Sequence, residues 1–184
     1  MDKATVRQET LGKLRKLGLV PSRKEQQEKA ILDQLFQSSL WQEASSVGVT
    51  LSMGLEFSTE PIIERAWQEG KTVAVPKTRP ERKMDFIKIT SGTIYEKSHF
   101  GVREPLNDDI IKETQLDLLI VPGVAFRLDG YRVGFGGGYY DRYLAGYPGQ
   151  TCSLVFQEQL NQEWEPGPLD LPVSTIFMKQ WTDK

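Results

Sequence analysis

The segment from Arg132 to Arg142 (RVGFGGGYYDR) has the residue types and spacing best suited to bind a phosphate group. Four of the five residues from Gly134 to Gly138 are glycine. A backbone without Cβ atoms can approach a phosphate closely, and glycine adopts the positive φ angles that turn successive N–H groups inward. The two arginines can pair with phosphate oxygens, and Asp141 is a hard carboxylate suited to Mg²⁺. The segment therefore predicts a phosphate site beside a magnesium site.

Neither of the two common phosphate-binding motifs is present. GxxxxGK[ST] does not occur, and GxGxxG starting at Gly134 would need glycine at the position of Tyr139. Composition alone favours a flexible surface loop, because glycine clusters are usually loops. Two features favour the phosphate site instead. The loop closely follows a predicted buried strand, and it leads directly into a predicted helix at 139–144, whose N-terminus would add free N–H donors and a favourable dipole.

The composition and charge of the chain favour small-molecule ligands over nucleic acid. Of 184 residues, 39% are hydrophobic and 26% charged, which are the proportions of a globular protein with a sizeable core. The 23 basic and 25 acidic side chains give a net charge of −2, whereas nucleic-acid binders usually carry a basic excess. We expect no nucleic-acid partner, and a local basic pocket for phosphate or carboxylate stays open. The sequence indicates no oligomeric state.

The single cysteine and the single histidine exclude several kinds of site. Cys152 cannot form an internal disulfide, and its apolar neighbours predict a buried strand residue and not a nucleophile. With His99 as the only histidine, no cluster of histidine ligands can form around a metal. No apolar run is long enough to span a membrane, and Met1 to Arg7 lacks the features of a signal peptide. We expect a cytoplasmic protein without membrane contact.

Apolar periodicity and turn residues predict helices that alternate with short strands. Ser22 with Glu25 forms a capping-box pattern that we expect to start the second helix. The segment 116–121 is nearly all apolar, as in a central strand buried on both faces. Loops are predicted at 79–83 and 100–109. The predicted helices are 3–17, 22–40, 59–69 and 139–144, and the predicted strands are 47–53, 72–75, 85–89, 116–121, 151–156 and 173–177.

This order predicts an α/β fold: a single three-layer domain over residues 1–184, with a mostly parallel sheet and helices on both faces. In such sheets, ligands bind beyond the carboxyl ends of the strands. Three segments should therefore meet at the site: the loop after Met53, the loop after Val121 and the glycine-rich segment.

Several segments, taken together, resemble the 5-formyltetrahydrofolate cyclo-ligase (5,10-methenyltetrahydrofolate synthetase) family. The most specific part is Val121-Pro122-Gly123-Val124-Ala125-Phe126, followed by Gly130, 132–142 and Leu144. The other matches, in chain order, are Lys3 with Arg7, Leu51-Ser52-Met53 with Glu56 and Thr59, Gly101 with Glu104-Pro105, and Asp170 with Pro172-Val173. The resemblance covers essentially the whole chain, and the family's three-layer α/β fold agrees with the predicted elements.

The resemblance implies that ATP is the co-substrate. Without it, Lys3 and Arg7 would simply belong to a solvated helix face; with it, they become two phosphate ligands one helical turn apart. The residues that match the family's ATP site are Lys3, Arg7, Arg132, Val133, Gly134, Phe135, Gly136, Gly137, Gly138, Tyr139 and Tyr140.

The resemblance also implies a magnesium ion held by Asp141 and Asp170. Taken alone, Asp170 would be a turn residue before a terminal strand. Family members often carry a histidine before this aspartate and a second aspartate after Pro-Val, where this chain has Leu169 and Ser174. Ser174 is therefore given no metal role.

The implied folate pocket contains Leu51 and Glu56. A carboxylate can accept two N–H bonds from the guanidine-like edge of a pterin, although Glu56 alone would read as an exposed loop acid. Some members have a lysine in the glycine run, where this chain has Gly137. The residues expected to line the other side of the folate are Phe135, Gly136, Gly137, Gly138 and Tyr139.

The implied reaction converts 5-formyltetrahydrofolate and ATP to 5,10-methenyltetrahydrofolate, ADP and phosphate. Lys3, Arg7 and Arg132 would stabilise charge, and no covalent nucleophile is needed. Two alternatives stay open: a ligase acting on another N-formyl compound, and a protein that binds formylfolate without turnover. The second would have no need of Lys3 and Asp141, whose presence favours the enzyme. A nucleic-acid module is a weaker third alternative.

Overall fold

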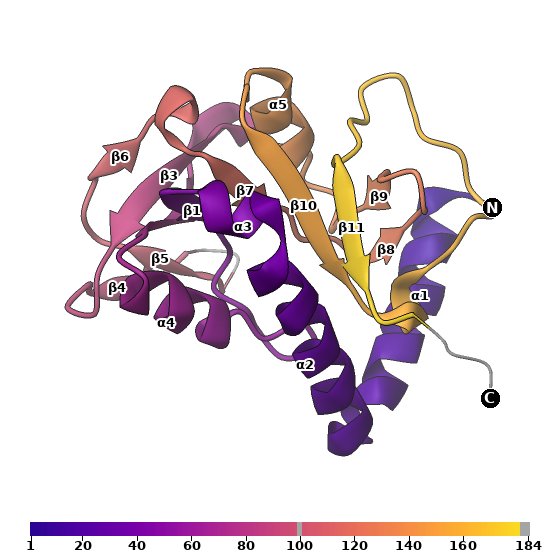
Figure 1. Ribbon diagram of the computed structural model, residues 1–184. Helices are drawn as coiled ribbons and strands as arrows, with labels where there is room; N and C mark the ends of the chain where they lie inside the picture. Colours follow the sequence, from indigo (N-terminus) through magenta and orange to yellow (C-terminus); the bar gives the residue numbers. More distant parts are fainter. Residues whose placement is uncertain (99–100, 181–184) are drawn as a thin grey trace.

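The computed structural model describes residues 1–98 and 101–180. Its centre is a seven-stranded sheet in the order β11-β10-β7-β1-β2-β3-β6 (Figure 1). The first five strands run parallel, and β3 and β6 are antiparallel. The strands of this sheet are β1 (Ser46–Gly48), β2 (Thr72–Thr78), β3 (Met84–Ile89), β6 (Ile110–Ile111), β7 (Leu118–Ile120), β10 (Gln150–Val155) and β11 (Thr175–Met178).

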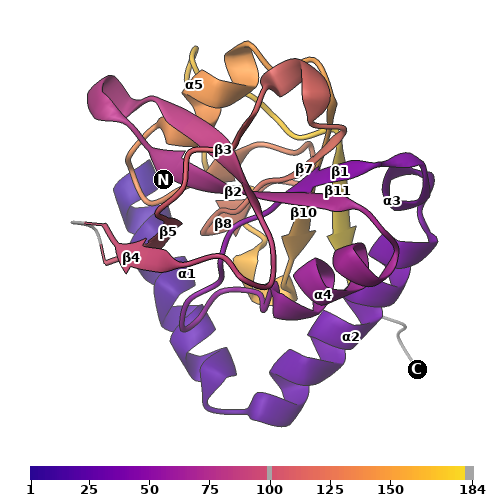
Figure 2. The ribbon, with the colours of Figure 1, turned by 90° about the vertical axis from the view of Figure 1, so that its left-hand side faces the viewer.

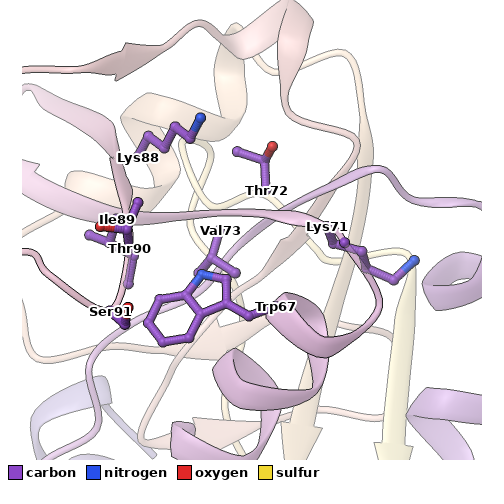
Figure 3. Close-up of a pocket in the computed structure, with 9 residues that line it drawn as sticks. Trp67, Lys71, Thr72, Val73, Lys88, Ile89, Thr90 and Ser91 are labelled. Carbon is purple, nitrogen blue, oxygen red and sulfur yellow. The ribbon is translucent and has the colours of Figure 1, made fainter.

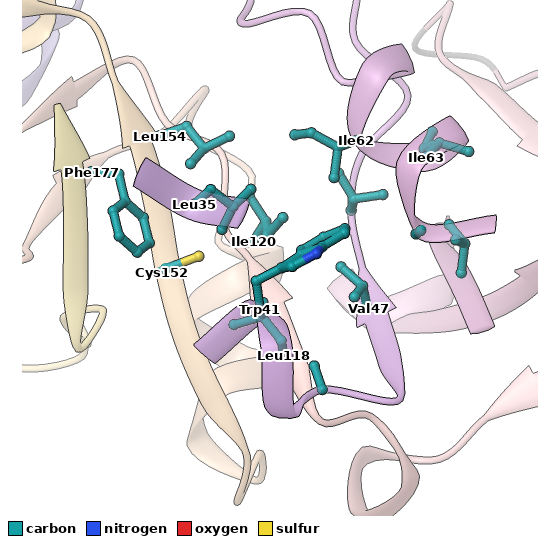
Figure 4. Close-up of a cluster of buried hydrophobic side chains, with 14 of the residues drawn as sticks. Leu35, Trp41, Val47, Ile62, Ile63, Leu118, Ile120, Cys152, Leu154 and Phe177 are labelled. Carbon is teal, nitrogen blue, oxygen red and sulfur yellow. The ribbon is translucent and has the colours of Figure 1, made fainter. Parts of the chain in front are cut away.

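One face of the sheet is covered by three helices: α2 (Pro21–Gln37), α3 (Ser39–Glu43) and α4 (Glu60–Gln68). Their apolar side chains pack on alternate residues of the strands, around the fully buried indole of Trp41 (Figure 4). Cys152 is completely buried in this cluster, and burial raises the pKa of its thiol to about 12. The prediction that it is a core residue is therefore confirmed.

The other face is covered by α5 (Tyr139–Ala145), whose aromatic residues pack on Phe86 and on the outer side of β7. The Phe86 and Tyr143 ring centres lie 5.0 Å apart. Because helices cover both faces, the central strands are apolar throughout; all three residues of β7 are buried. The predicted three-layer α/β fold is confirmed.

The first helix, α1 (Lys3–Gly18), lies beside α2 and packs against a small hairpin, β8 (Ala125–Phe126) with β9 (Arg132–Val133) (Figure 2). Val6 joins Ala125, Val133 and Trp164 in a separate small core. The N-terminal turn of α1 is thereby fixed next to the glycine-rich segment. A second hairpin, β4 (Tyr95–Lys97) with β5 (Arg103–Pro105), completes the strands.

Three details of the sequence prediction are wrong. Helix α2 begins at Pro21, one residue before the expected cap, because proline is favourable in a first turn; Ser22 caps nothing. The predicted strand 47–53 pairs only as Ser46–Gly48, and its remainder leaves the sheet to form a loop. The predicted loop 100–109 contains β5; its first residue, Phe100, lies outside the described residues, as does His99.

None of the helices in the described ranges has the length and apolar character needed to cross a membrane. What the fold provides instead is a functional edge. The carboxyl ends of β1, β7 and β10 point the same way, since these strands are parallel. The loop after β1, the segment after β7 and the turn before β11 therefore converge at one end of the sheet.

Candidate active site

The N-terminal turns of α1 present two cations to the glycine-rich segment. Lys3 and Arg7 are four residues apart, and so project from the same face of the helix. The Arg7 Nε donates a hydrogen bond of 2.7 Å to the carbonyl oxygen of Gly134. The two predicted ATP-binding segments, which are far apart in sequence, are thus in direct contact.

The glycine-rich segment connects β9 to α5 in a conformation that depends on glycine. Gly136 and Gly138 have φ angles of 102° and 72°, which L side chains rarely adopt. Within the described part of the chain, the N–H groups of residues 135–138 donate no hydrogen bonds. They are therefore available to an anionic ligand, and Phe135 beside them is 65% exposed.

Gly137 shows why a lysine at this position would need a different local packing. A Cβ atom built on Gly137 would lie 2.7 Å from the ring of Tyr139. The Tyr139 ring occupies the place where a side chain at 137 would begin. This chain thus has an aromatic ring beside the phosphate loop in place of the lysine of some family members.

Arg132 and Asp141 bracket the segment and pair with each other. The Nη2 of Arg132 lies 3.1 Å from Oδ1 of Asp141, and its Nη1 donates to the carbonyl of Leu171 at 3.0 Å. The arginine side chain is only 5% exposed. Asp141 Oδ1 also accepts from the N–H of Leu171 at 3.2 Å. A buried cation and a carboxylate thereby bind both polar groups of one residue in the turn before β11.

Lys3 and Asp170 form a second ion pair at the same turn. The other donor to this carboxylate is the N–H of Gly167, at 2.7 Å from Oδ2. Burial would raise the pKa of Asp170, but the hydrogen bonds from Lys3 and Gly167 and the nearby charges of Lys3 and Arg132 hold it below its usual value. Asp170 is therefore ionised at neutral pH.

The carboxylate set fits a magnesium ion that arrives with a nucleotide. Mg²⁺ typically takes one or two protein carboxylates, several waters and substrate phosphates. Asp141 and Asp170 are anchored through one oxygen each to the 167–171 turn. Among the described residues, no group of three or more His, Cys, Asp or Glu side chains could hold a metal ion without phosphate. The arrangement suits a shared, substrate-completed site.

Leu169 and Ser174, the two departures from the family pattern, lie outside this arrangement. Leu169 is 84% exposed. Ser174 is used structurally, since its N–H donates to the Thr151 hydroxyl at 2.9 Å and its own hydroxyl lies 3.2 Å from the same oxygen. The serine fastens the start of β11 to β10.

Glu56 lies in the loop after β1, which is closed at its base by reciprocal hydrogen bonds. The Ser52 N–H donates to Thr59 Oγ1 at 3.0 Å, and the Thr59 N–H donates to Ser52 Oγ at 3.1 Å. Glu28 of α2 accepts from the Ser58 N–H at 2.6 Å. Burial raises the pKa of Glu56 to about 7. An acid in such a loop is ready to accept donors from a ligand.

Leu51, the other predicted folate residue, is half-buried and packs against the large core cluster. The sequence gave no sign of two further features. Nothing in the pattern around Glu28 indicated that it holds the Glu56 loop. The hydroxyl of Tyr140 is buried near Glu56, which only the folded arrangement reveals.

A hollow of about 390 Å³ lies elsewhere, between the start of β2 and the end of β3 (Figure 3). It is lined by Trp67, Lys71, Lys88 and neighbouring residues. These lie at the amino ends of the parallel strands, away from every residue of the predicted site. Ligands of parallel sheets bind at the opposite ends, so this hollow is not the candidate site.

The arrangement of α1, the glycine-rich segment and the two aspartates can now be compared with known proteins. The model of the 5-formyltetrahydrofolate cyclo-ligase family matches residues 1–179. The chain belongs to this family.

Relatives and solved structures agree with the assignment. A 5-formyltetrahydrofolate cyclo-ligase of Haemophilus influenzae is 28% identical over 181 residues, covering 94% of this chain and 97% of that protein. The match to a Caenorhabditis elegans relative, at 33% identity, covers 66% of this chain and 63% of that protein. The Aquifex aeolicus 5,10-methenyltetrahydrofolate synthetase structure has a TM-score of 0.82 at 24% identity, covering 100% of this chain and 95% of the other, which shows the shared fold.

Proposed function

We propose that this chain closes the ring of 5-formyltetrahydrofolate to give 5,10-methenyltetrahydrofolate, with conversion of one ATP to ADP and phosphate. The observation that carries the proposal is the convergence, in a member of this family, of three parts at one end of the sheet. These are the Lys3–Arg7 face of α1, the glycine-rich segment with its free N–H groups, and the Asp141–Asp170 pair. The Glu56 loop lies at the same end.

The ATP side of the site consists of cations and main-chain donors. The N–H groups of 135–138 suit phosphate oxygens, and Lys3, Arg7 and Arg132 suit the charge of the polyphosphate. Lys3 and Arg132 are already held by Asp170 and Asp141. Their side chains therefore need little ordering when the nucleotide binds, which lowers the entropic cost of binding.

Asp141 and Asp170 would hold Mg²⁺ with the nucleotide phosphates. When bound, the ion would offset negative charge on the transferring phosphoryl group. The residues themselves orient the cations: Asp141 aligns the Arg132 guanidinium, and Asp170 aligns the Lys3 ammonium. Positioning and charge compensation are the main demands of phosphoryl transfer.

The folate side is centred on Glu56. In its ionised form, the carboxylate can accept two N–H bonds from one edge of the pterin. The exposed Phe135 and the half-buried Tyr139 supply apolar surface for a flat ring on the side of the glycine-rich segment. Leu51 packs below the Glu56 loop and supports its position.

The chemistry needs activation because a formamide oxygen is a poor leaving group. The formyl oxygen attacks the γ-phosphorus of ATP, and ADP leaves with the bridging oxygen. N10 of the folate then attacks the formyl carbon and loses its proton, and the carbon–oxygen bond breaks with release of phosphate. The protein aligns two substrates and neutralises charge, which agrees with the absence of a cysteine or serine nucleophile among the assigned residues.

The experiment is to follow methenyl formation by absorbance with the purified chain, 5-formyltetrahydrofolate, ATP and Mg²⁺. Product should appear only when all components are present. A second N-formyl substrate, such as a formylated amino sugar, should give no turnover. Tight binding of formylfolate without ATP consumption would instead identify a sequestering protein, and preferential turnover of the other compound would identify a different ligase.

A further inference from the structure

Tyr140 carries a buried polar group whose role the ATP site does not explain. Its hydroxyl oxygen is inaccessible to solvent and has no hydrogen-bond partner among the described residues. Leaving a buried hydroxyl unpaired is costly, since its hydrogen bonds to water are lost without replacement. Such orphaned groups in a folded chain are uncommon and call for a missing partner.

The surroundings of this hydroxyl place it toward the folate side of the site. The ring of Tyr140 packs edge-on against Phe86, with 6.5 Å between ring centres, beneath α5. Burial raises the pKa of the hydroxyl; of the charged groups that act on it, Arg132 lowers this pKa and Glu56 raises it. The hydroxyl is therefore enclosed in the region shared by Glu56 and Arg132, away from the main-chain N–H groups of the phosphate loop.

The chemistry of a pterin edge determines what this hydroxyl would do. If the Glu56 carboxylate accepts from the ring N–H and the neighbouring amino group, the atom on either side of that donor pair is an acceptor: a carbonyl oxygen or a ring nitrogen. A hydroxyl next to Glu56 would then donate. Tyr140 and Glu56 together would read the acceptor–donor–donor–acceptor pattern of the ring.

We propose that Tyr140 is a specificity-determining residue whose hydroxyl donates a hydrogen bond to an acceptor flanking the pterin N–H pair held by Glu56. This inference rests on the proposed function and deepens it. It moves the Tyr140 side chain from the ATP side, where the family resemblance puts the residue, to the folate side.

Tyr143 provides a matched control on the same helix. Its hydroxyl is also buried and without a hydrogen-bond partner in the described ranges, and its ring packs against Phe86 as well. The charged groups that act on it are Glu113 and Asp85, and Glu56 is not among them. Tyr143→Phe therefore makes the same chemical change in the same core without facing the folate.

The test measures binding of 5-formyltetrahydrofolate, of tetrahydropterin and of a non-hydrolysable ATP analogue to wild type, Tyr140→Phe and Tyr143→Phe. Tyr140→Phe should weaken the folate and the bare pterin by the same factor of about ten, the loss expected for one buried hydrogen bond. ATP-analogue affinity should stay within about twofold, as the hydroxyl is away from the phosphates. The melting temperature of both ligand-free variants should not fall, because each loses an unpaired buried hydroxyl.

Unchanged folate affinity in Tyr140→Phe would overturn the proposal. So would equal weakening of the ATP analogue, or the same folate loss in Tyr143→Phe, since either would indicate a packing effect. If wild type converts 5-formyltetrahydrofolate and only the Tyr140 result fails, the cyclo-ligase function stands. If wild type neither binds nor converts the folate, both proposals are wrong.

Discussion

Arg132 and Asp141 form an ion pair across the glycine-rich segment, with 3.1 Å between Nη2 and Oδ1. The pair joins the two ends of the segment, so the phosphate loop is closed at its base before any ligand binds. The same aspartate accepts the N–H of Leu171. Asp141 therefore has a structural connection as well as its proposed metal role, and the two can be separated experimentally.

Asp141→Asn should abolish most turnover while leaving the fold intact. The amide keeps an oxygen for Arg132 and Leu171, but it loses the charge that would hold Mg²⁺. We expect added Mg²⁺ to recover part of the activity, and the melting temperature to fall by roughly 2–4 °C for a loss of about 1 kcal/mol. Asp129→Asn is the control, since it removes a carboxylate from an exposed pair with Arg127 on the nearby hairpin. A large stability loss with normal turnover would make Asp141 purely structural.

Lys3→Gln should weaken ATP and spare the folate. Loss of a charge-assisted bond to phosphate is worth about 1.5–3 kcal/mol, or roughly a 10- to 150-fold rise in the Kd of an ATP analogue measured by calorimetry. Lys13→Gln, on an exposed position of the same helix, changes the charge equally and should have no effect. An equal effect of the two variants would show that only the overall charge of α1 matters.

Folate affinity should rise with pH through about 7. Burial raises the pKa of Glu56 to about 7, and only the ionised carboxylate accepts both pterin donors. Glu56→Gln should lose roughly 10- to 150-fold in affinity at pH 8 and approach wild type at pH 5.5. Titrations of both proteins across this range check the prediction, with the exposed Glu60→Gln as control. A parallel pH profile in wild type and Glu56→Gln would contradict it.

The same carboxyl gives the ligand-free chain a pH-dependent stability. Between 4.5, the ordinary pKa, and about 7, the folded chain holds the Glu56 proton and the unfolded chain has released it. The contribution of Glu56 to stability is therefore lost as pH rises through this window. Glu56→Gln should gain stability relative to wild type at pH 8, by up to roughly 3 kcal/mol, and little at pH 4. Denaturant unfolding at both values measures this difference.

Gly130→Ala should destabilise the fold by about 2–4 kcal/mol. Gly130 has a φ of 94°, and a Cβ there would lie 2.2 Å from the Val173 carbonyl oxygen, so the hairpin and the turn before β11 would separate. Gly12→Ala is the control within α1, where a Cβ meets nothing within 4 Å; it should stabilise by about 0.5–1 kcal/mol. Thermal unfolding of the two variants should shift in opposite directions.

The sequence predicted the elements whose signal is local. The apolar run 116–121 predicted β7, because a strand buried on both faces needs apolar residues throughout. The start of α2 was mispredicted, since two valid local signals competed and Pro21 in the first turn prevailed over Ser22. The early end of β1 has no local signal, as it depends on where its partners β2 and β7 stop pairing.

The site was predictable as a set of residues but not as a set of contacts. The resemblance named Lys3, Asp141 and Asp170, yet the pairing of Lys3 with Asp170 joins residues 167 positions apart. The position of the Tyr140 hydroxyl near Glu56 likewise depends on how α5 packs against Phe86. Such relationships are set by the packing of whole elements, which no short segment encodes.

The central claim is that the formyl oxygen of the folate is phosphorylated by ATP in this site, and oxygen labelling tests it most directly. The purified chain would convert 5-formyltetrahydrofolate carrying ¹⁸O in the formyl group, with ATP and Mg²⁺ in unlabelled water. The account predicts one phosphate for each methenyl product, and mass spectrometry should find the ¹⁸O of the formyl group in that phosphate. Methenyl product formed without phosphate, or phosphate that carries no label, would contradict it.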